Sequence, residues 1–271
     1  MPELPEVETV KEVLKKEVLN KTIKDVIIRY DKILENIEPK SFIEKIKNQT
    51  IIDIKRKGKW LLFELTDYYL LSHLRMEGKY YIKNSDDEIT KHQHVIFIFE
   101  DGKQLRYNDT RKFGKMYLLD KDNIYNKKPL IDVGKEPWEL DVDYLKDNFK
   151  NKKLPIKTVL LDQTIIAGLG NIYCNEVLFR SKINPYKKAF ELNDKELESI
   201  IINSKITLEK AIKLGGTTIK SYTSSEGVHG RFQNELLVHM KTVCPECGSA
   251  LLKEKIGGRT TYYCSICQKM K

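Results

Sequence analysis

The feature that most restricts the fold of this chain is a pair of CxxC motifs near its C-terminus. Cys244 and Cys247 form the first motif, Cys264 and Cys267 form the second, and 16 residues separate them. Two such motifs at this spacing supply four thiolates for one tetrahedral Zn²⁺ ion. Because four Cys ligands leave no coordination position open, one structural zinc is predicted rather than a catalytic one. So short a stretch cannot build its own core, and the metal supplies its folding free energy.

The alternative for these cysteines is two redox-active pairs or a chance pattern. The N-terminus shows neither the basic nor the apolar segment of a secretory signal, which predicts a reducing, cytoplasmic compartment. In that compartment a paired Cys motif indicates a metal site before a disulfide. The fifth cysteine, Cys174, falls in a predicted helix, where we expect a small buried apolar side chain.

Length and charge narrow the class of protein. The 271 residues suggest about two domains, and 48 Lys and Arg against 39 Asp and Glu give a net charge of +9. This balance favours a polyanionic partner, with nucleic acid ahead of a membrane surface, although a basic housekeeping protein is the alternative. No apolar run approaches the roughly 18 residues of a membrane span, which argues against a membrane protein.

Hydrophobic periodicity predicts an α+β chain. Val7, Val10, Leu14 and Val18 fall on one helical face, which predicts a helix from Pro5 to about residue 20. Short β-rich runs separated by turn residues then predict an antiparallel β-sandwich or barrel-like sheet, with one helical insertion at residues 41–48. The eight predicted strands are residues 23–29, 51–55, 60–65, 68–73, 79–82, 94–100, 104–108 and 116–119.

The second half of the chain changes character. Residues 121–153 are rich in Lys, Asn and Asp, and we place a hinge there. Helices are predicted at residues 155–161, 171–181 and 193–214, and a Gly-rich turn opens the second of them. A polar loop at residues 217–230 then precedes the zinc module. The predicted division is an N-terminal β-sandwich domain (1–125), a hinge (126–154), a helical domain (155–235) and a four-Cys zinc finger (236–271).

The N-terminal residues offer an unusual nucleophile. Removal of Met1 would leave Pro2 with a free secondary amine, and an α-amino group titrates about two units or more below lysine. Attack of a secondary amine on a sugar aldehyde carbon gives a charged iminium, an electron sink suited to elimination. Glu3 and Glu6 would stand beside it as proton carriers. The alternative is that Pro and Glu here are ordinary helix start signals.

Five motifs in one order then match a known family. They are PELPEVET at residues 2–9, SHLRMEG at 72–78, NDTRKFG at 108–114, GLGNIY at 168–173, and the four-Cys ribbon. Together they resemble the bacterial formamidopyrimidine-DNA glycosylases over the whole chain. The related endonuclease VIII group usually has Gly where Leu4 stands, so the first motif favours the branch that acts on purine lesions.

The resemblance implies catalytic roles residue by residue. Pro2 is similar to the nucleophile that displaces the damaged base at C1′ and forms a Schiff base. Glu3 matches the acid that opens the deoxyribose ring, with Glu6 in support. Lys59 matches a lysine assigned to β-elimination and to a phosphate contact, and Arg259 matches the ribbon arginine assigned to the phosphate and to δ-elimination.

The resemblance also implies DNA contacts. Asn171 sits at the turn of a helix–two-turn–helix motif, where its side chain and a helix N-terminus can hold a phosphate. The other residues at matching or candidate DNA-binding positions are His92, Arg111, Lys152, Lys157 and His73.

Three residues resemble the wedge with which such enzymes replace an extruded base. Met76 and Phe113 are shaped to fill apolar space, and Arg111 can hydrogen-bond the orphaned partner base. For Met76 and Phe113 the alternative is simple core packing.

The chain departs from the family pattern in two places. The stretch between Val238 and Cys244 is shorter than family members usually have, and an aromatic phosphate-contacting residue often found there is replaced by His239 or lost. The loop at residues 217–230 keeps only the general character of its counterpart. The printed chain also includes Met1, and with Met1 retained the Pro2 nitrogen is an amide that cannot act as the nucleophile.

The sequence therefore predicts a bifunctional glycosylase and abasic-site lyase for oxidised purines in duplex DNA, with DNA across a basic cleft between two domains. It should hold one structural zinc, use no redox or nucleotide cofactor, and act as a monomer on the bacterial nucleoid in the cytoplasm. The alternatives are an endonuclease VIII-like enzyme that favours oxidised pyrimidines and a non-catalytic DNA-binding protein.

Overall fold

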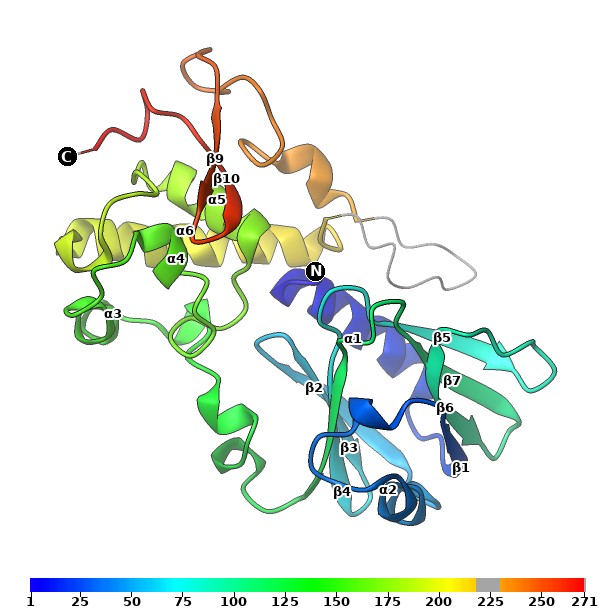
Figure 1. Ribbon diagram of the computed structural model, residues 1–271. Coiled ribbons are helices and arrows are strands. Elements are labelled where there is room, and N and C mark those ends of the chain that lie inside the picture. Colours follow the sequence, from blue (N-terminus) through cyan, green and yellow to red (C-terminus); the bar gives the residue numbers. More distant parts are fainter. Residues whose placement is uncertain (218–229, 271) are drawn as a thin grey trace. The chain divides into compact units, whose positions relative to one another are not determined.

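The computed structural model describes residues 1–217 and 230–270. Its described residues divide into two compact units, whose helices and strands are labelled in Figure 1. We call them the N-terminal unit (residues 1–131, with Gly230) and the C-terminal unit (residues 132–217 and 231–270). The predicted loop at residues 217–230 lies outside the described residues except for its two ends. No helix in the described part of the chain is long and apolar enough to cross a membrane.

Helix α1 (Leu4–Val18) opens the N-terminal unit as its periodicity predicts. The side chains of Val7, Val10, Leu14 and Val18 are all buried. Pro5 stands in the first turn, where its missing N–H costs nothing, and Glu6 in the same turn favours the helix dipole. The helix therefore presents one apolar face to the sheets and begins at the residues of greatest chemical interest.

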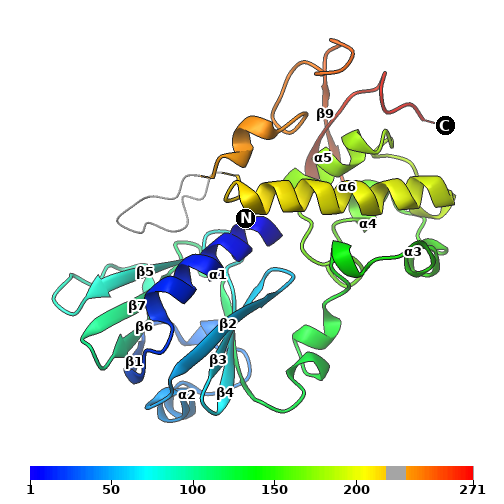
Figure 2. The same ribbon diagram turned by 180° about the vertical axis from the view of Figure 1, so that it is seen from behind.

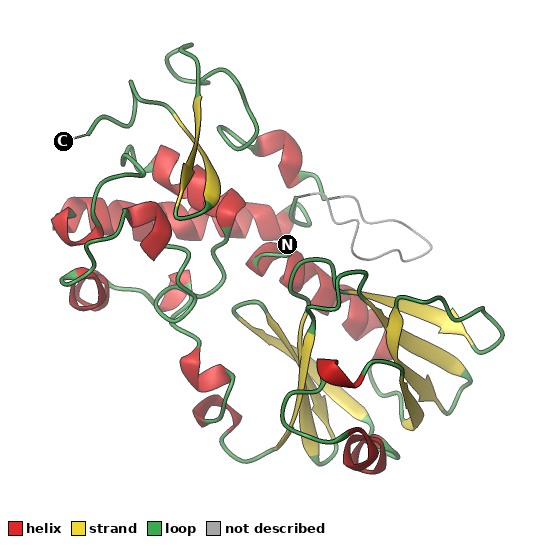
Figure 3. Cartoon of the chain, in the orientation of Figure 1, coloured by secondary structure: helices red, strands yellow, loops and turns green. Residues whose placement is uncertain are grey.

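All eight predicted strands are present and form two four-stranded antiparallel sheets, shown in yellow in Figure 3. The sheet orders are β1-β6-β7-β5 and β2-β3-β4-β8. The strands are β1 (Ile23–Ile28), β2 (Ile51–Lys57), β3 (Trp60–Leu65), β4 (Tyr68–His73), β5 (Lys79–Asn84), β6 (Gln93–Phe99), β7 (Lys103–Asn108) and β8 (Lys115–Asp120). The predicted helical insertion is α2 (Pro39–Ile46).

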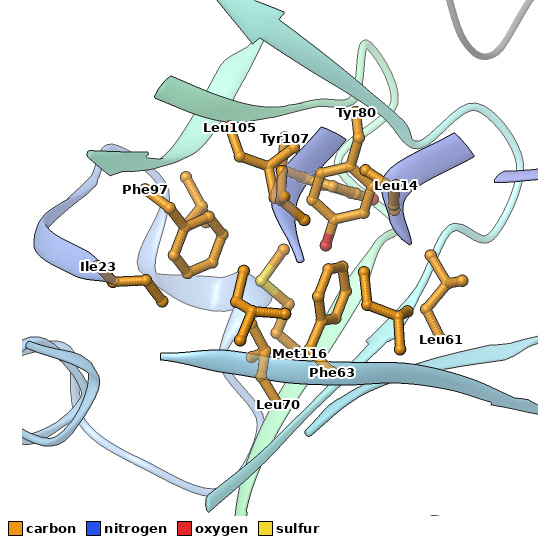
Figure 4. Packing of buried hydrophobic residues seen from close by; sticks show 14 of the residues in the cluster. Leu14, Ile23, Leu61, Phe63, Leu70, Tyr80, Phe97, Leu105, Tyr107 and Met116 are labelled. Atoms are coloured by element: carbon orange, nitrogen blue, oxygen red, sulfur yellow. The ribbon is translucent and has the colours of Figure 1, made fainter. Parts of the chain in front are cut away.

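One apolar core joins the two sheets. Phe63 and Leu70 come from one sheet, Phe97 and Tyr107 from the other, and Leu14 from α1 (Figure 4). Burial of a large apolar side chain stabilises a fold by about 1.5–3 kcal/mol. The observed architecture is thus the predicted antiparallel β-sandwich with an N-terminal helix.

The C-terminal unit is built on helices α3 (Val142–Phe149), α4 (Ile156–Val159), α5 (Asn171–Arg180) and α6 (Asp194–Lys213). Helix α6 packs against α5, as Figure 2 shows from behind. The sequence analysis did not predict α3, which lies inside the segment predicted as a hinge. Its signals are short: Asp141 caps the helix by accepting the N–H of Tyr144 at 2.7 Å, and only Leu145 and Phe149 are buried in it.

The C-terminal residues form a two-stranded hairpin of β9 (Leu252–Ile256) and β10 (Arg259–Tyr263). Its turn is Gly257-Gly258, and both glycines have a positive φ, 55° and 74°. A Cβ on Gly257 would lie 2.6 Å from the Thr158 hydroxyl, so this glycine allows the hairpin to approach α4 closely.

Short 3₁₀ segments complete the described chain. They are Asp31–Ile33, Ile124–Asn126, Leu130–Asp132, Pro137–Glu139, Ala189–Glu191 and Phe232–Glu235.

Candidate functional site

The N-terminal residues lie at the start of α1 and are buried. Pro2 is buried, Glu3 is 2% exposed and Glu6 is 4% exposed. The Glu6 carboxylate accepts the backbone N–H of Glu3 at 3.0 Å, which fixes Glu3 as the residue before the helix. A helix N-terminus favours negative charge, so the fold holds two carboxylates beside Pro2. These residues can therefore start the helix and also serve in catalysis, so the two interpretations of the motif do not exclude each other.

Lys59 and His73 lie at one end of the β3–β4 ladder. Lys59 precedes β3 and is 5% exposed, while His73 ends β4 opposite Trp60 and is 9% exposed. The backbone N–H of Arg75 donates to Nδ1 of His73 at 3.0 Å, so the ring proton is on Nε2. Burial, followed by the charges of Arg75 and Lys59, lowers the pKa of His73 to about 3. His73 is consequently a neutral hydrogen-bond donor.

The predicted wedge residues lie on two loops of the N-terminal unit. Met76 is half-buried in the loop between β4 and β5. Arg111 is exposed and Phe113 is 48% exposed in the loop between β7 and β8, and the guanidinium carbon of Arg111 lies 4.8 Å from the Phe113 ring centroid. An exposed Phe stacked under an exposed Arg is not core packing, so that alternative is wrong for Phe113.

His92 is half-buried just before β6. Its carbonyl accepts the N–H of Asp109 at 2.9 Å, which joins it to the base of the Arg111 loop. The structure thus groups His92, Arg111 and Phe113 around Asp109, a residue that sequence reasoning did not single out.

In the C-terminal unit, Asn171 is the first residue of α5 and links this helix to the hairpin. Its side-chain NH₂ donates to the carbonyl of Thr260 at 2.9 Å, next to the exposed Arg259 at the start of β10. The glycine-rich turn therefore places Asn171 and Arg259 on two elements that contact each other.

Lys157 is fully buried in α4. Its ammonium donates to the carbonyl of Asn171 at 3.0 Å and to Oδ1 of Asn175 at 2.6 Å. Lys152 does not share this network with Lys157. Its ammonium lies 3.9 Å from the Asp162 carboxylate, and among the described residues it makes no hydrogen bond to Asn171.

His239 is 9% exposed and belongs to the same network. Because Lys157 can only donate, Oδ1 of Asn175 faces it and the amide nitrogen faces Nδ1 of His239 at 2.8 Å. His239 therefore carries its proton on Nε2. Burial, followed by the charge of Lys157, lowers the pKa of His239 to about 4, so this ring is also neutral.

Glu176 holds the segment that contains His239. Its carboxylate is fully buried and accepts the N–H groups of Leu237, Val238 and His239 at 2.8, 3.0 and 2.9 Å. Sequence reasoning missed Glu176 and Asn175, although two polar residues inside the otherwise apolar helix NIYCNEVLFR were an available signal. Cys174 in this helix is buried as predicted.

The four predicted zinc ligands come together. The Sγ atoms of Cys244, Cys247, Cys264 and Cys267 all lie within 4.8 Å of one another, with 3.8 Å between Cys244 and Cys267 and 3.5 Å between Cys247 and Cys264. A tetrahedron of sulfurs with Zn–S bonds of about 2.3 Å has edges of about 3.8 Å. The donor set therefore fits one structural zinc ion.

The net charge of +9, the exposed Arg111–Phe113 pair and the four-cysteine hairpin beside the N-terminus of α5 are features of proteins that bind nucleic acid. The buried Pro2, Glu3 and Glu6 add groups suited to chemistry on it. Three family models match it. They are the formamidopyrimidine-DNA glycosylase N-terminal domain over residues 1–116, the H2TH domain of that enzyme over 133–223, and the zinc finger found in FPG and IleRS over 243–269.

Full-length relatives agree. The chain is 48% identical to the formamidopyrimidine-DNA glycosylase of Bacillus cereus (strain ATCC 10987 / NRS 248), with 99% of each chain covered, and 45% identical to that of Bacillus subtilis (strain 168), with 100% of each covered. A crystal structure of Lactococcus lactis Fpg in complex with DNA containing N7-benzyl-Fapy-dG superimposes with a TM-score of 0.92, at 38% identity and 99% and 100% coverage. The chain belongs to the formamidopyrimidine-DNA glycosylase family, and it is a DNA glycosylase with one structural zinc site.

Proposed function

We propose that this protein removes oxidised purines, 8-oxoguanine and formamidopyrimidines, from duplex DNA and then cuts the strand at the resulting abasic site. The observation that carries the proposal is Pro2 buried beside Glu3 and Glu6 at the N-terminus of α1. Glu6 has a structural use, because it caps the start of α1. The burial of Pro2 and Glu3 beside it favours a catalytic protein over a non-catalytic DNA-binding one, because burial of a carboxylate is unfavourable.

The chemistry begins when Met1 is removed and the Pro2 nitrogen becomes a secondary amine. This nitrogen attacks C1′ of the damaged nucleotide, the C1′–N9 bond breaks, and the base leaves with a proton. Glu3 donates a proton to the ring oxygen, which opens the sugar and leaves an iminium between Pro2 and C1′. Glu6, which accepts the Glu3 N–H, keeps Glu3 in place.

Elimination follows from the iminium. Loss of a C2′ proton drives departure of the 3′ phosphate, and a second proton loss drives departure of the 5′ phosphate. We assign Lys59 to the first elimination and Arg259 to the phosphate and the second. Water then hydrolyses the iminium and frees Pro2 as the secondary amine. The neutral Nε2–H of His73, near Lys59, is suited to donate to a phosphate oxygen.

The C-terminal unit holds the DNA backbone in this proposal. Asn171 keeps one amide hydrogen for a phosphate after its bond to Thr260. Buried Lys157 acts through Asn171 and Asn175, and Lys152 adds a contact nearer the surface.

The N-terminal unit adds His92 as a DNA contact and the three wedge residues. Met76 and Phe113 fill the vacancy that the extruded base leaves, and Arg111 hydrogen-bonds the opposite base.

We further propose the domain limits given by the sequence, namely 1–125, 126–154, 155–235 and 236–271. We also propose that it works in the bacterial cytoplasm, on the nucleoid, because metal-binding thiols stay reduced there and its substrate is DNA.

Borohydride trapping tests the function directly. Wild-type protein on an 8-oxoguanine duplex should give a crosslink that mass spectrometry maps to Pro2, and Pro2→Gly should lose most excision activity. A crosslink at an internal lysine, together with full activity of Pro2→Gly, would overturn the proposed nucleophile. A lesion panel decides between oxidised purines and the oxidised pyrimidines of the alternative enzyme.

Salt dependence tests the DNA contacts. Because phosphate binding releases condensed counterions, affinity for duplex DNA should fall steeply between roughly 50 and 200 mM salt. A flat response over this range would contradict the phosphate roles of Lys59 and Arg259.

A further inference from the structure

A buried carboxylate stands at the base of the loop that carries Arg111 and Phe113. Asp109 follows β7 and is 1% exposed, although the residues at the loop tip are exposed. Its Oδ1 accepts the N–H of Arg111 at 2.9 Å, and its Oδ2 accepts the N–H groups of Phe113 and Gly114 at 2.9 and 2.8 Å. In the described part of the chain no cation pairs with this carboxylate.

The backbone of the loop is shaped around Asp109. Lys112, between Arg111 and Phe113, has a φ of 58°, in the left-handed region that non-glycine residues rarely occupy. Successive N–H groups around such a residue form a concavity that binds anions. Here the anion is a side chain of the same loop, so the carboxylate supports the unfavourable conformation of Lys112 and fixes the direction of its neighbours.

Tyr107 packs beneath both wedge loops, which are the β4–β5 loop with Met76 and the β7–β8 loop with Arg111 and Phe113. A Cβ on Gly114 would lie 1.8 Å from the Tyr107 hydroxyl, and a Cβ on Gly78, two residues after Met76, would lie 2.3 Å from the same atom. The Tyr107 ring itself is buried in the sandwich core against Tyr80 (Figure 4). Burial, followed by the Asp109 carboxylate, raises the pKa of Tyr107, so the hydroxyl keeps its proton.

Further bonds tie Asp109 and its loop to their neighbours. The Asp109 carbonyl lies 2.7 Å from Nε2 of His94 in β6, and the hydroxyl of Thr110 donates to the carboxylate of Glu77 in the Met76 loop. The base of the Arg111 loop is thus attached to the sandwich and to the second wedge loop.

We propose that Asp109 is a positioning residue that sets the orientation in which Arg111 meets the base opposite the lesion. The proposal rests on the proposed function, in which Arg111 hydrogen-bonds the base opposite the lesion; we call the recognition of that base by Arg111 its readout role. A guanidinium presents donors only, and cytosine offers it O2 and N3 as two acceptors, whereas adenine places an amino donor beside N1. Two bonds form together only if the guanidinium is held in one orientation, and Asp109 holds the backbone at residues 111, 113 and 114.

The test is single-turnover cleavage by four proteins: wild type, Asp109→Asn, Arg111→Ala and Asp101→Asn. Each acts on 8-oxoguanine opposite C, on 8-oxoguanine opposite A, and on a preformed abasic site opposite C. Asp109→Asn replaces one accepting oxygen by an NH₂ group that faces N–H donors. Asp101 is the matched control, because it also accepts a backbone N–H, that of Lys103, and its change to Asn removes the same charge at the other end of the β6–β7 hairpin.

Wild type and Asp101→Asn should cleave 8-oxoguanine opposite C about ten to one hundred times faster than 8-oxoguanine opposite A. Asp109→Asn should lower this ratio about tenfold, and its cleavage of the abasic site should stay within about threefold of wild type, since no base remains to be extruded. A purely structural role would lower all three rates together and leave the ratio unchanged.

The outcomes separate the two proposals. If Arg111→Ala keeps the wild-type ratio, the readout role of Arg111 is wrong. If Arg111→Ala lowers the ratio and a folded Asp109→Asn keeps it, the readout stands and the positioning role of Asp109 is overturned. If circular dichroism shows that Asp109→Asn does not fold, Gly114→Ala takes its place in the same assay. Its Cβ meets the Tyr107 hydroxyl and displaces the loop, so an unchanged ratio there also overturns the proposal.

Discussion

The two units each hold a functional segment with one buried carboxylate, over very different distances along the chain. Asp109 accepts three N–H groups from residues two to five positions later. Glu176 accepts three N–H groups from residues 61 to 63 positions later. The first carboxylate closes its own loop, while the second joins helix α5 to the segment at residues 237–239.

The difference teaches how each segment depends on its surroundings. The Asp109 loop depends only on hydrogen bonds within the loop and on packing against the β-sandwich core. The Glu176 segment needs α5 in place, and it leads directly into the hairpin that the four cysteines hold. We therefore expect local perturbations to act on the first region without the second, and metal loss to act on the second without the first.

Zinc removal should have the largest effect on structure and DNA affinity, and it should affect the C-terminal unit without the N-terminal unit. Structural zinc sites contribute apparent binding free energies of about 10–16 kcal/mol, so a chelator should unfold the hairpin β9–β10 and free Asn171 from Thr260. Circular dichroism and NMR of the chelated protein should show the β-sandwich intact and DNA affinity strongly reduced. Cys247→Ser should give the same result, and unchanged DNA affinity after complete zinc removal would contradict it.

Acid should act on both units through their buried histidines. Burial lowers the pKa values of His73 and His239 to about 3 and about 4, so the unfolded chain binds protons below about pH 6.5 and the folded chain does not. Stability is therefore fully present above pH 6.5 and is lost as pH falls, down to about pH 3 for His73 and about pH 4 for His239.

The expected loss is up to about 4 kcal/mol for His73 and about 2 kcal/mol for His239 after allowance for solvent screening. Urea unfolding between pH 7.5 and 3 measures this loss of stability. His73→Gln and His239→Gln should each flatten the curve relative to wild type, and parallel curves for all three proteins would refute the assignment.

Glu176→Gln should destabilise the C-terminal unit by about 3 kcal/mol, because an NH₂ group replaces an acceptor that faces buried N–H donors. Thermal unfolding followed by a probe in that unit measures it, and the β-sandwich should be unaffected. Glu235→Gln is the control: its carboxylate forms a half-exposed ion pair with Lys210 at 2.5 Å, which is worth less than about 1 kcal/mol. Equal effects of the two variants would show that the three bonds of buried Glu176 stabilise the unit no more than a half-exposed ion pair does.

Asn193→Ala should give the smallest effect, about 1 kcal/mol. Asn193 caps α6 by accepting the N–H of Glu196 at 3.1 Å, a bond as local as those of Asp109 but exposed to solvent. Lys195→Ala, in the same helical turn, should change stability by a few tenths of a kcal/mol. If Asn193→Ala cost as much stability as Glu176→Gln, the contribution of such bonds to stability would not depend on whether they are local or long-range.

The sequence by itself determined what depends on short-range order. The face of α1, the eight strands and the cysteine ligand set all follow from spacing, since periodicity of 3.6 or 2 and metal-ligand intervals are visible in one dimension. The candidate residues Pro2, Glu3, Arg111 and Phe113 came from motifs, and Asp109 lay inside a quoted motif. Its Asn-Asp-Thr turn composition was a usable signal for side chain to backbone bonding.

Only the tertiary structure decided what depends on long-range contact. The tautomer of His239, the bonds of buried Lys157 and the three bonds of Glu176 depend on contacts between residues whose sequence separation carries no pattern. Helix α3 escaped prediction because only two of its residues are buried, so its apolar periodicity is too weak to stand out in a polar segment. A buried polar group is stable only when partners satisfy it, and those partners are chosen by how the chain packs.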